Sequence, residues 1–203
     1  MKSELLTKKR WHWAIFAALF CIVAPLYGGE YYYQQAADQL IFRHTVSHSF
    51  MADSPQFELE IYGDGTTRIY IHPVNKIDGL RQRGQFEAKL ASERIREIFD
   101  ILEKEGVLSF RAETVRAKKA AEPKQGTATD PLVVQFEIYL EEYIGAAGAT
   151  GPLEKHIQWT GPMTDADRYP EIKSLQGLAR ATKELTLWLC DLARELERAG
   201  AAQ

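Results

Sequence analysis

Two histidines, His44 and His48, are spaced as a pair of metal ligands could be. On a helix, a separation of four residues would place both imidazoles on one face, as a zinc site requires. The alternative is a solvated juncture between two parts of the chain. No glutamate lies beside these histidines and no third ligand is evident, so we expect the juncture.

Asp165 and Asp167 lie in a turn-rich stretch and could hold a hard cation. Calcium takes six or more oxygen ligands, and two carboxylates fall short of that number. Glu141 and Glu142 form a consecutive pair of the kind that is typical of solvated charges at the end of a strand. We therefore expect neither a metal nor a cofactor.

The patterns of covalent catalysis are absent from the sequence. There is no Gly-x-Ser-x-Gly, no Cys-x-x-Cys-His and no dinucleotide fingerprint. The glycine-rich stretch 145–151 lacks the Lys-Ser/Thr of a phosphate loop. Cys21 and Cys190 lie far apart in the sequence and indicate no disulfide framework. The sequence predicts that this protein is not an enzyme.

The rest of the chain is organised around the run from Trp11 to Tyr27, which contains no charged residue. As a helix it would reach about 25 Å, at the short end of a membrane span. Continuing through Gly28 and Gly29 would add the missing length. We predict a transmembrane helix over residues 11–29.

Basic residues before this run set its predicted orientation. Lys8, Lys9 and Arg10 precede it, whereas the first charge after it is Glu30, so residues 1–10 are expected to be a cytoplasmic tail. Aromatic rings at both ends would serve as membrane-interface anchors. These anchors are Trp11, Trp13, Tyr27, Tyr31, Tyr32 and Tyr33.

A cleaved secretory signal is the alternative interpretation of the N-terminal run. No A-x-A-like pair precedes a suitable cleavage point, because Leu26 or Tyr27 stands where a small residue is needed. A lipoprotein signal would use Cys21, but Phe20 precedes it. The sequence favours an uncleaved anchor in a bacterial inner membrane, with the following domain in the periplasm.

Charge divides unevenly along the 203 residues, whose formal net charge is −3. The first ten residues carry four basic and one acidic side chain, and the remainder carries 21 basic and 27 acidic ones. An acidic outer part does not favour nucleic acid. We expect a helical stalk over residues 30–55 and one extracytoplasmic domain over residues 56–203.

The pattern of that domain predicts an α+β fold. Alternating strands begin at Phe57 and Thr67 around a Gly63–Gly65 turn, and the Glu58 and Glu60 face is expected to meet Arg68 across them. The expected order is β-β-β-α-β-β-α, a two-layer domain with an antiparallel sheet of about five strands and both helices on one face. The last two strands and the helices are expected at 132–140, 153–159, 92–105 and 170–198.

Some of these features resemble a known family. The Asp64-Gly65 turn, Tyr70 on the returning strand, Gly84 before the third strand and Pro170 before the last helix are similar to a bacterial family of exported or membrane-anchored domains of unknown function. The resemblance covers roughly Phe57 to Leu192. It implies the fold and carries no chemistry.

The segment Arg111–Thr129 is longer than the family's linkers, and its composition predicts an exposed, mobile loop. A basic cluster within it is an alternative docking element for an acidic partner. The cluster consists of Arg116, Lys118, Lys119 and Lys124.

Two classes of function remain open at this point. In the first, the protein is a non-catalytic, single-pass accessory or assembly subunit that braces integral proteins of a larger membrane complex, photosynthetic or respiratory, in contact with membrane lipid. In the second, it is a membrane-anchored periplasmic module that binds or senses a ligand. Tyr31 to Tyr33 and the off-stripe residue Leu187 place unexplained apolar surface where a bracing subunit would need it, and so favour the first.

Overall fold

The computed structural model describes residues 29–48, 55–73, 84–124, 131–145, 148 and 150–200. Seven strands and four helices are present in this part of the chain. The strands are β1 (Glu30–Tyr32), β2 (Leu40–His48), β3 (Pro55–Tyr62), β4 (Thr66–Ile71), β5 (Gly84–Lys89), β6 (Leu132–Ile144) and β7 (Thr150–Thr160). The helices are α2 (Ser92–Lys104), α3 (Ala112–Ala121), α4 (Pro162–Arg168) and α5 (Lys173–Arg198).

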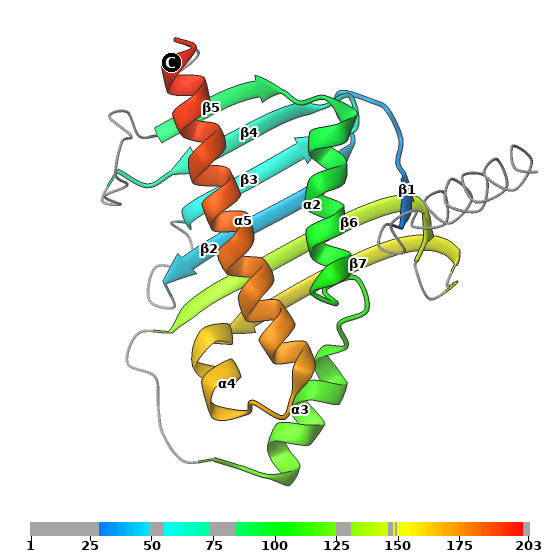
Figure 1. Cartoon of the computed structure of the whole chain (residues 1–203), viewed down its shortest axis with the longest axis vertical. Coiled ribbons are helices and arrows are strands. Elements are labelled where there is room, and N and C mark those ends of the chain that lie inside the picture. The colour runs from blue at the N-terminus through cyan, green and yellow to red at the C-terminus, as the bar shows by residue number, and fades with distance from the viewer. Residues whose placement is uncertain are drawn as a thin grey trace, which may run out of the picture.

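The strands form one antiparallel sheet in which β6 is the central connector (Figure 1). One edge of β6 pairs first with β2, up to Ile138, and then with β1, from Glu142 onward. Its other edge pairs with β7. Beyond β2, the sheet continues through β3 and β4 to β5. The 13 residues of β6 therefore join segments from both ends of the chain.

Side chains alternate between the two faces of this sheet, as the period of a strand requires. Phe42 and Val46 of β2 belong to the apolar core, and the Phe42 ring contacts Phe99 of α2, so they and His44 point to the helix-bearing face. Helices α2 and α5 cross the strands on that face (Figure 1). The intervening Arg43 and Thr45 point to the other face. All four described helices lie on the first face or at its end, so the apolar core forms between helices and sheet.

Helices α2 and α5 pack through the apolar stripes expected from their sequences. In α2 the buried residues recur at Ile95, Ile98, Phe99 and Leu102. The C-terminal end of α2 comes very close to α5 at Gly177, where a Cβ atom would lie 1.9 Å from the Glu105 carbonyl oxygen. Only glycine fits this crossing.

The structure confirms the predicted α+β class, the antiparallel sheet and the placement of helices on one face. The expected hairpin is β3–β4, the long strand is β6 and the last helix is α5. The predicted element order is incomplete, because the sheet has seven strands rather than about five and two short helices, α3 and α4, are added.

The predicted stalk over residues 30–55 is wrong. Residues 30–32 and 40–48 form β1 and β2, both paired with β6 inside the domain sheet. Helix-compatible composition is a weak preference, and tertiary pairing overrides it here. In β2 the alternation of Phe42, His44 and Val46 with Arg43 and Thr45 fits a strand between two partners.

The predicted mobile loop at 111–129 is wrong over its first half, where residues 112–121 form α3. Its alanines favour a helix, and Val115 is buried against the core. Helix α4 likewise occupies part of the stretch interpreted as turn-rich.

No helix in the described part of the chain is long and apolar enough to cross a membrane. The predicted transmembrane helix over 11–29 lies almost wholly outside the described residues, which begin at Gly29.

Candidate functional site

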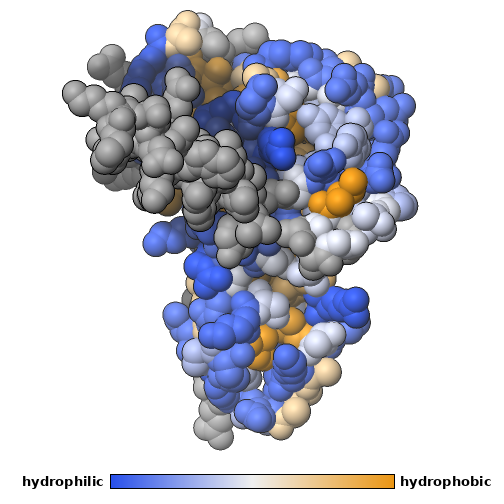
Figure 2. Space-filling model, turned by 45° about the vertical axis from the view of Figure 1, so that its right-hand side comes forward, coloured by the Kyte–Doolittle hydropathy of each residue, from blue (hydrophilic) through white to orange (hydrophobic). Residues whose placement is uncertain are grey.

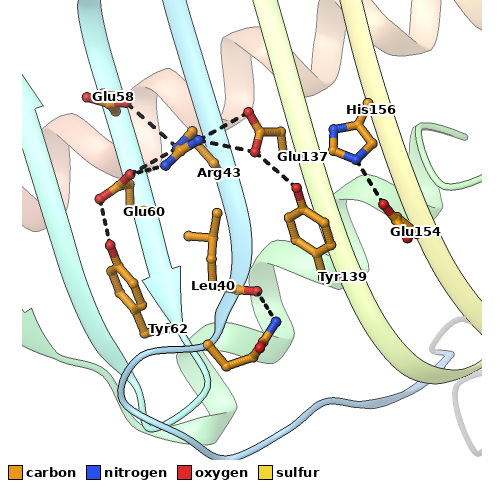
Figure 3. A network of polar contacts seen from close by, with 10 residues as sticks. Leu40, Arg43, Glu58, Glu60, Tyr62, Glu137, Tyr139, Glu154 and His156 are labelled. Carbon is orange, nitrogen blue, oxygen red and sulfur yellow. Dashed lines mark hydrogen bonds and ion pairs between the residues drawn. The ribbon is translucent and has the colours of Figure 1, made fainter.

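The face of the sheet that no described helix covers carries a connected set of charged and phenolic side chains, which we call the open face (Figure 3). Arg43 of β2 stands at its centre, between β3 and β6. Its register partners are Glu60 on β3 and Glu137 on β6. Because residues two apart on a strand share a face, Tyr62 and Tyr139 follow these glutamates on the same side.

The Arg43 guanidinium bonds to carboxylates on both neighbouring strands. Its Nη2 and Nε donate to Glu60 Oε1 at 2.7 and 2.9 Å, and its Nη1 donates to Glu137 Oε2 at 3.1 Å. Glu58 Oε1 lies 3.9 Å from Nε. One cation thus serves three carboxylates, which the planar fork of arginine permits better than lysine would.

Two tyrosines complete the network on either side of Arg43. The Tyr62 hydroxyl donates to Glu60 Oε2 at 3.1 Å, and the Tyr139 hydroxyl donates to Glu137 Oε2 at 3.2 Å. Arg68 donates to the Tyr62 hydroxyl at 3.2 Å, and its guanidinium lies over the same ring. These bonds hold the central side chains in one arrangement.

The network shifts the pKa of its members in the directions expected for a crowded, half-buried cluster. Burial lowers the pKa of Arg43, but its bonds to Glu60 and the charge of Glu137 outweigh that effect and hold the pKa above its ordinary value. Burial and the charge of Glu60 raise the pKa of Glu58. The ionised form of Glu58 is therefore disfavoured in this cluster.

Negative charge exceeds positive charge across the open face. Arg43, Arg68 and Lys89 are its cations; Arg68 pairs with Glu87 at 3.5 Å, and Lys89 pairs with Asp64. Five glutamates share the face: Glu58, Glu60, Glu87, Glu137 and Glu154. A depression of about 380 Å³ lies between Glu58, Tyr70 and Glu87. This arrangement can bind a cation by charge and hydrogen bonding.

Sequence reasoning missed Arg43 because its strand was taken for a stalk. A usable signal was present, since Glu60-Ile61-Tyr62 and Glu137-Ile138-Tyr139 repeat the same Glu-x-Tyr spacing. The expected contact of Glu58 and Glu60 with Arg68 is not the one formed. Glu60 is opposite Arg68 in register, yet it bonds to Arg43.

Of the predicted membrane-interface anchors, the structure describes three, and two of these pack their side chains against the core of the domain. The Tyr31 hydroxyl donates to Glu103 at 2.7 Å and to Asp100 at 3.0 Å, and its ring contacts Phe99. Tyr33 is half-buried against Phe99. Tyr32 is exposed. Trp11, Trp13 and Tyr27 lie outside the described residues, as do Lys8, Lys9 and Arg10.

Glu103 also binds the backbone of Gly29, the residue before β1. It accepts a bond from the Gly29 amide at 2.7 Å and another from the Tyr143 hydroxyl at 3.0 Å. A Cβ at Gly29 would lie 2.5 Å from Glu103 Oε2, so glycine permits this close approach. Burial and the bond to Glu103 raise the pKa of Tyr31 and of Tyr143. The entry of the chain into the domain is a defined junction.

The two possible metal sites are not formed. His44 and His48 lie on one strand, where four residues span about 13 Å, too far for a shared ion. His44 is buried against Phe136, with Nδ1 3.1 Å from the Gln135 carbonyl oxygen. Asp165 accepts bonds from Lys119 and Trp159. No group of three His, Cys, Asp or Glu residues suited to a metal occurs in the described part of the chain.

The basic cluster is largely used inside the molecule. Lys119 pairs with Asp165 at 2.6 Å and lies over the Trp159 ring. Lys124 pairs with Glu171, and Arg116 stacks on Trp159. Of the four, Lys118 alone has no such contact among the described residues. We do not expect this cluster to dock an acidic partner.

Apolar surface is limited on the side of the molecule seen in Figure 2, where hydrophobic colour forms small separate patches. Only Tyr32 and Leu187 are large, apolar and exposed among the described residues. Leu187 borders a groove of about 400 Å³ between α5, α4 and the adjacent ends of β2, β3 and β6. We call this the α5 groove.

No protein-family model matches the chain, and none of the curated proteins is detectably similar to it in sequence.

Proposed function

We propose that this protein is a non-catalytic accessory or assembly subunit whose open face docks a basic surface of a larger membrane protein complex. The observation that carries the proposal is the uncovered sheet face, on which five glutamates accompany two arginines and one lysine, and that lysine is paired with Asp64. Complementary charge steers association and selects the partner surface.

The Arg43 network makes this face suitable for docking. Its side chains are already joined by hydrogen bonds before any partner arrives. A surface that is ordered in advance loses less conformational entropy on binding. Glu58 has only a distant contact with Arg43, at 3.9 Å, and can accept a cation from the partner.

The proposal places the domain in the bacterial periplasm, anchored in the inner membrane by residues 11–29. The Glu103 junction supports this, because it would transmit the position of an anchor directly to the domain. Integral proteins of a photosynthetic or respiratory complex, with membrane lipid, are the proposed partners.

The test is purification of the full chain through a tag at Gln203 in mild detergent, followed by native electrophoresis. We expect wild type to migrate with a membrane partner, and we expect high salt to weaken the complex because exposed charges are screened. A charge-reversal variant, E87K/E154K, should release the partner. The matched control, E113K/E122K, makes the same change of net charge on and after α3 and should retain it.

A chain that migrates alone at its monomer mass would contradict the docking proposal. So would equal retention by the two double variants. Glu87 and Glu154 are chosen because their side chains are 61% and 74% exposed, so their replacement leaves the fold intact.

The second proposal is a membrane-anchored module that binds or senses a ligand. One observation favours it, the α5 groove, whose lining is mostly apolar and includes a few polar groups. Such a composition is typical of small-molecule sites.

A further inference from the structure

The α5 groove lies at the end of the covered face, on the side of α5 where α4 packs. Val46, Phe57 and Leu132 from three strands line it together with Met163 of α4. Ala179 and Leu187 contribute from α5. Its volume of about 400 Å³ is in the range of small-molecule sites, roughly 300–1,000 Å³.

Two threonines of α5 in the lining have their hydroxyls occupied by their own helix. Thr182 Oγ1 donates to the Leu178 carbonyl oxygen at 2.9 Å, and Thr186 Oγ1 donates to the Thr182 carbonyl oxygen at 2.8 Å. Bonding of this kind satisfies the hydroxyl within the helix. Both residues then add methyl groups to the apolar wall.

Leu187 extends the apolar wall to the rim, where it is 56% exposed. Its side chain adds exposed apolar surface beside the apolar lining of the groove. Leu187 lies off the buried stripe of α5, so its side chain does not belong to the core.

Charge at the groove distinguishes its α5 wall from its α4 wall. Arg180 and Lys183 stand on α5, and Asp167, the lining's one carboxylate, stands on α4. The Nε of Arg180 is engaged by Glu105 Oε2 at 2.6 Å. Lys183 forms no ion pair among the described residues, so its ammonium group is available to an anion at the α5 rim.

We infer that the α5 groove binds a single-chain amphiphile with an anionic head, of the fatty-acid class. The hydrocarbon chain lies along Val46, Phe57 and Leu132, and the carboxylate stays at the rim beside Lys183. This inference deepens the second proposal by naming the ligand class, and it is independent of docking at the open face.

The experiment is photoaffinity labelling of the full chain in phosphatidylcholine nanodiscs with a diazirine analogue of palmitate. Mass spectrometry of the labelled peptides should place the label on α4 and on residues 176–187. Unlabelled laurate should compete for the site, and dodecyltrimethylammonium of the same chain length should not.

Two substitutions test the apolar wall and the charge separately. Ala179→Phe fills the groove and should abolish labelling of α4 and α5. Lys183→Glu should reduce it about fivefold, the upper range for one exposed ion pair. Lys173→Glu is the matched control on the first turn of α5 and should label like wild type. Circular dichroism shows whether each variant is folded, and Lys183→Glu keeps the test valid if the larger side chain is not tolerated.

Label confined to sites outside the groove would overturn the inference, as would equal labelling of wild type and Lys183→Glu. Equal competition by the cationic amphiphile would overturn the anionic head. Labelling that appears only after a co-purifying protein is removed would assign the groove to that protein and would also overturn it. None of these results depends on E87K/E154K, which tests the opposite face.

Discussion

The two faces of the sheet are built from the same strands but are stabilised in different ways. On the covered face, Phe42, Leu59, Ile138 and their neighbours lose contact with water under α2 and α5. On the open face, Arg43 joins carboxylates from β3 and β6. Burial of apolar surface is non-directional and tolerates many neighbours, whereas the ionic network requires particular partners at particular distances.

Each face also contains one group that does not match its surroundings. His44 lies in the apolar core, where its Nε2 has no hydrogen-bond partner among the described residues. Glu58 lies in the acidic cluster, where burial and the charge of Glu60 raise its pKa. These groups reduce stability, and the comparison between the faces can be tested by replacing them and their neighbours.

The largest effect is expected from Gly177→Ala on the covered face. In an ordinary helix this change is stabilising by roughly 1 kcal/mol. Here the new methyl group would collide with the Glu105 carbonyl oxygen, so we expect a loss of about 3 kcal/mol or more through displacement of α2 from α5. Urea unfolding measures the change. Unaltered or increased stability would show that the two helices separate easily.

His44 should make the covered face sensitive to acid. Burial lowers its pKa to about 4, compared with about 6.5 in an unfolded chain. The unfolded state binds the proton more readily than the folded state. The free energy of unfolding is therefore unaffected by this titration above pH 6.5 and decreases as the pH falls towards 4. The expected loss is about 3 kcal/mol.

The measurement is the free energy of unfolding of wild type and His44→Leu from pH 7 to pH 4. The difference between the two curves removes the contribution of other titrating groups. We expect the free energy of unfolding of His44→Leu to decrease less than that of wild type as the pH falls. Parallel curves would mean that the imidazole is hydrated in solution.

Replacing Arg43 by Met tests the open face. Glu60 and Glu137 would lose their shared cation while remaining mostly shielded, with side chains 16% and 23% exposed. A fully buried pair broken in this way costs roughly 3–5 kcal/mol, and we expect about 2 kcal/mol here because the site is partly solvated. Arg68→Met is the control, since its pair with Glu87 is exposed, and should cost less than about 0.5 kcal/mol. Similar losses of stability in the two variants would show that the ion pairs of Arg43 at the centre of the open face are no more stabilising than the exposed pair of Arg68.

The smallest effect is expected from Glu58→Gln. Removing a carboxylate whose pKa is raised should increase stability at pH 7 by a few tenths of a kcal/mol. The same variant should bind the proposed partner less well, as co-purification would show. Glu154→Gln at the exposed edge is the comparison for stability. A loss of stability at Glu58 would mean that its contact with Arg43 is favourable.

Local patterns were sufficient for much of the covered face. The β3–β4 hairpin, the buried stripe of α2 and the length of α5 all follow from residue spacing, because each is a periodicity of consecutive residues. The polar alternation of β3 and β4 also predicted that helices would cover one face only. These features need no knowledge of distant segments.

Pairing between distant segments decided the rest. The residues of β2 have a composition that a helix would also accept, and they form a strand because β3 and β6 present edges on both sides. The sequence indicated that Lys119 is a solvated surface charge, whereas in the folded chain it contacts Asp165 and Trp159.

The amino-acid sequence by itself determined the fold class, the β3–β4 hairpin, and the faces of α2 and α5 that are buried. Only the tertiary structure placed Arg43 between Glu60 and Glu137 and brought Glu103 into contact with Gly29. It also formed the α5 groove from strands and helices that are far apart in the chain. The physical reason is that periodicity records which side of an element avoids water, whereas a site depends on which elements become neighbours.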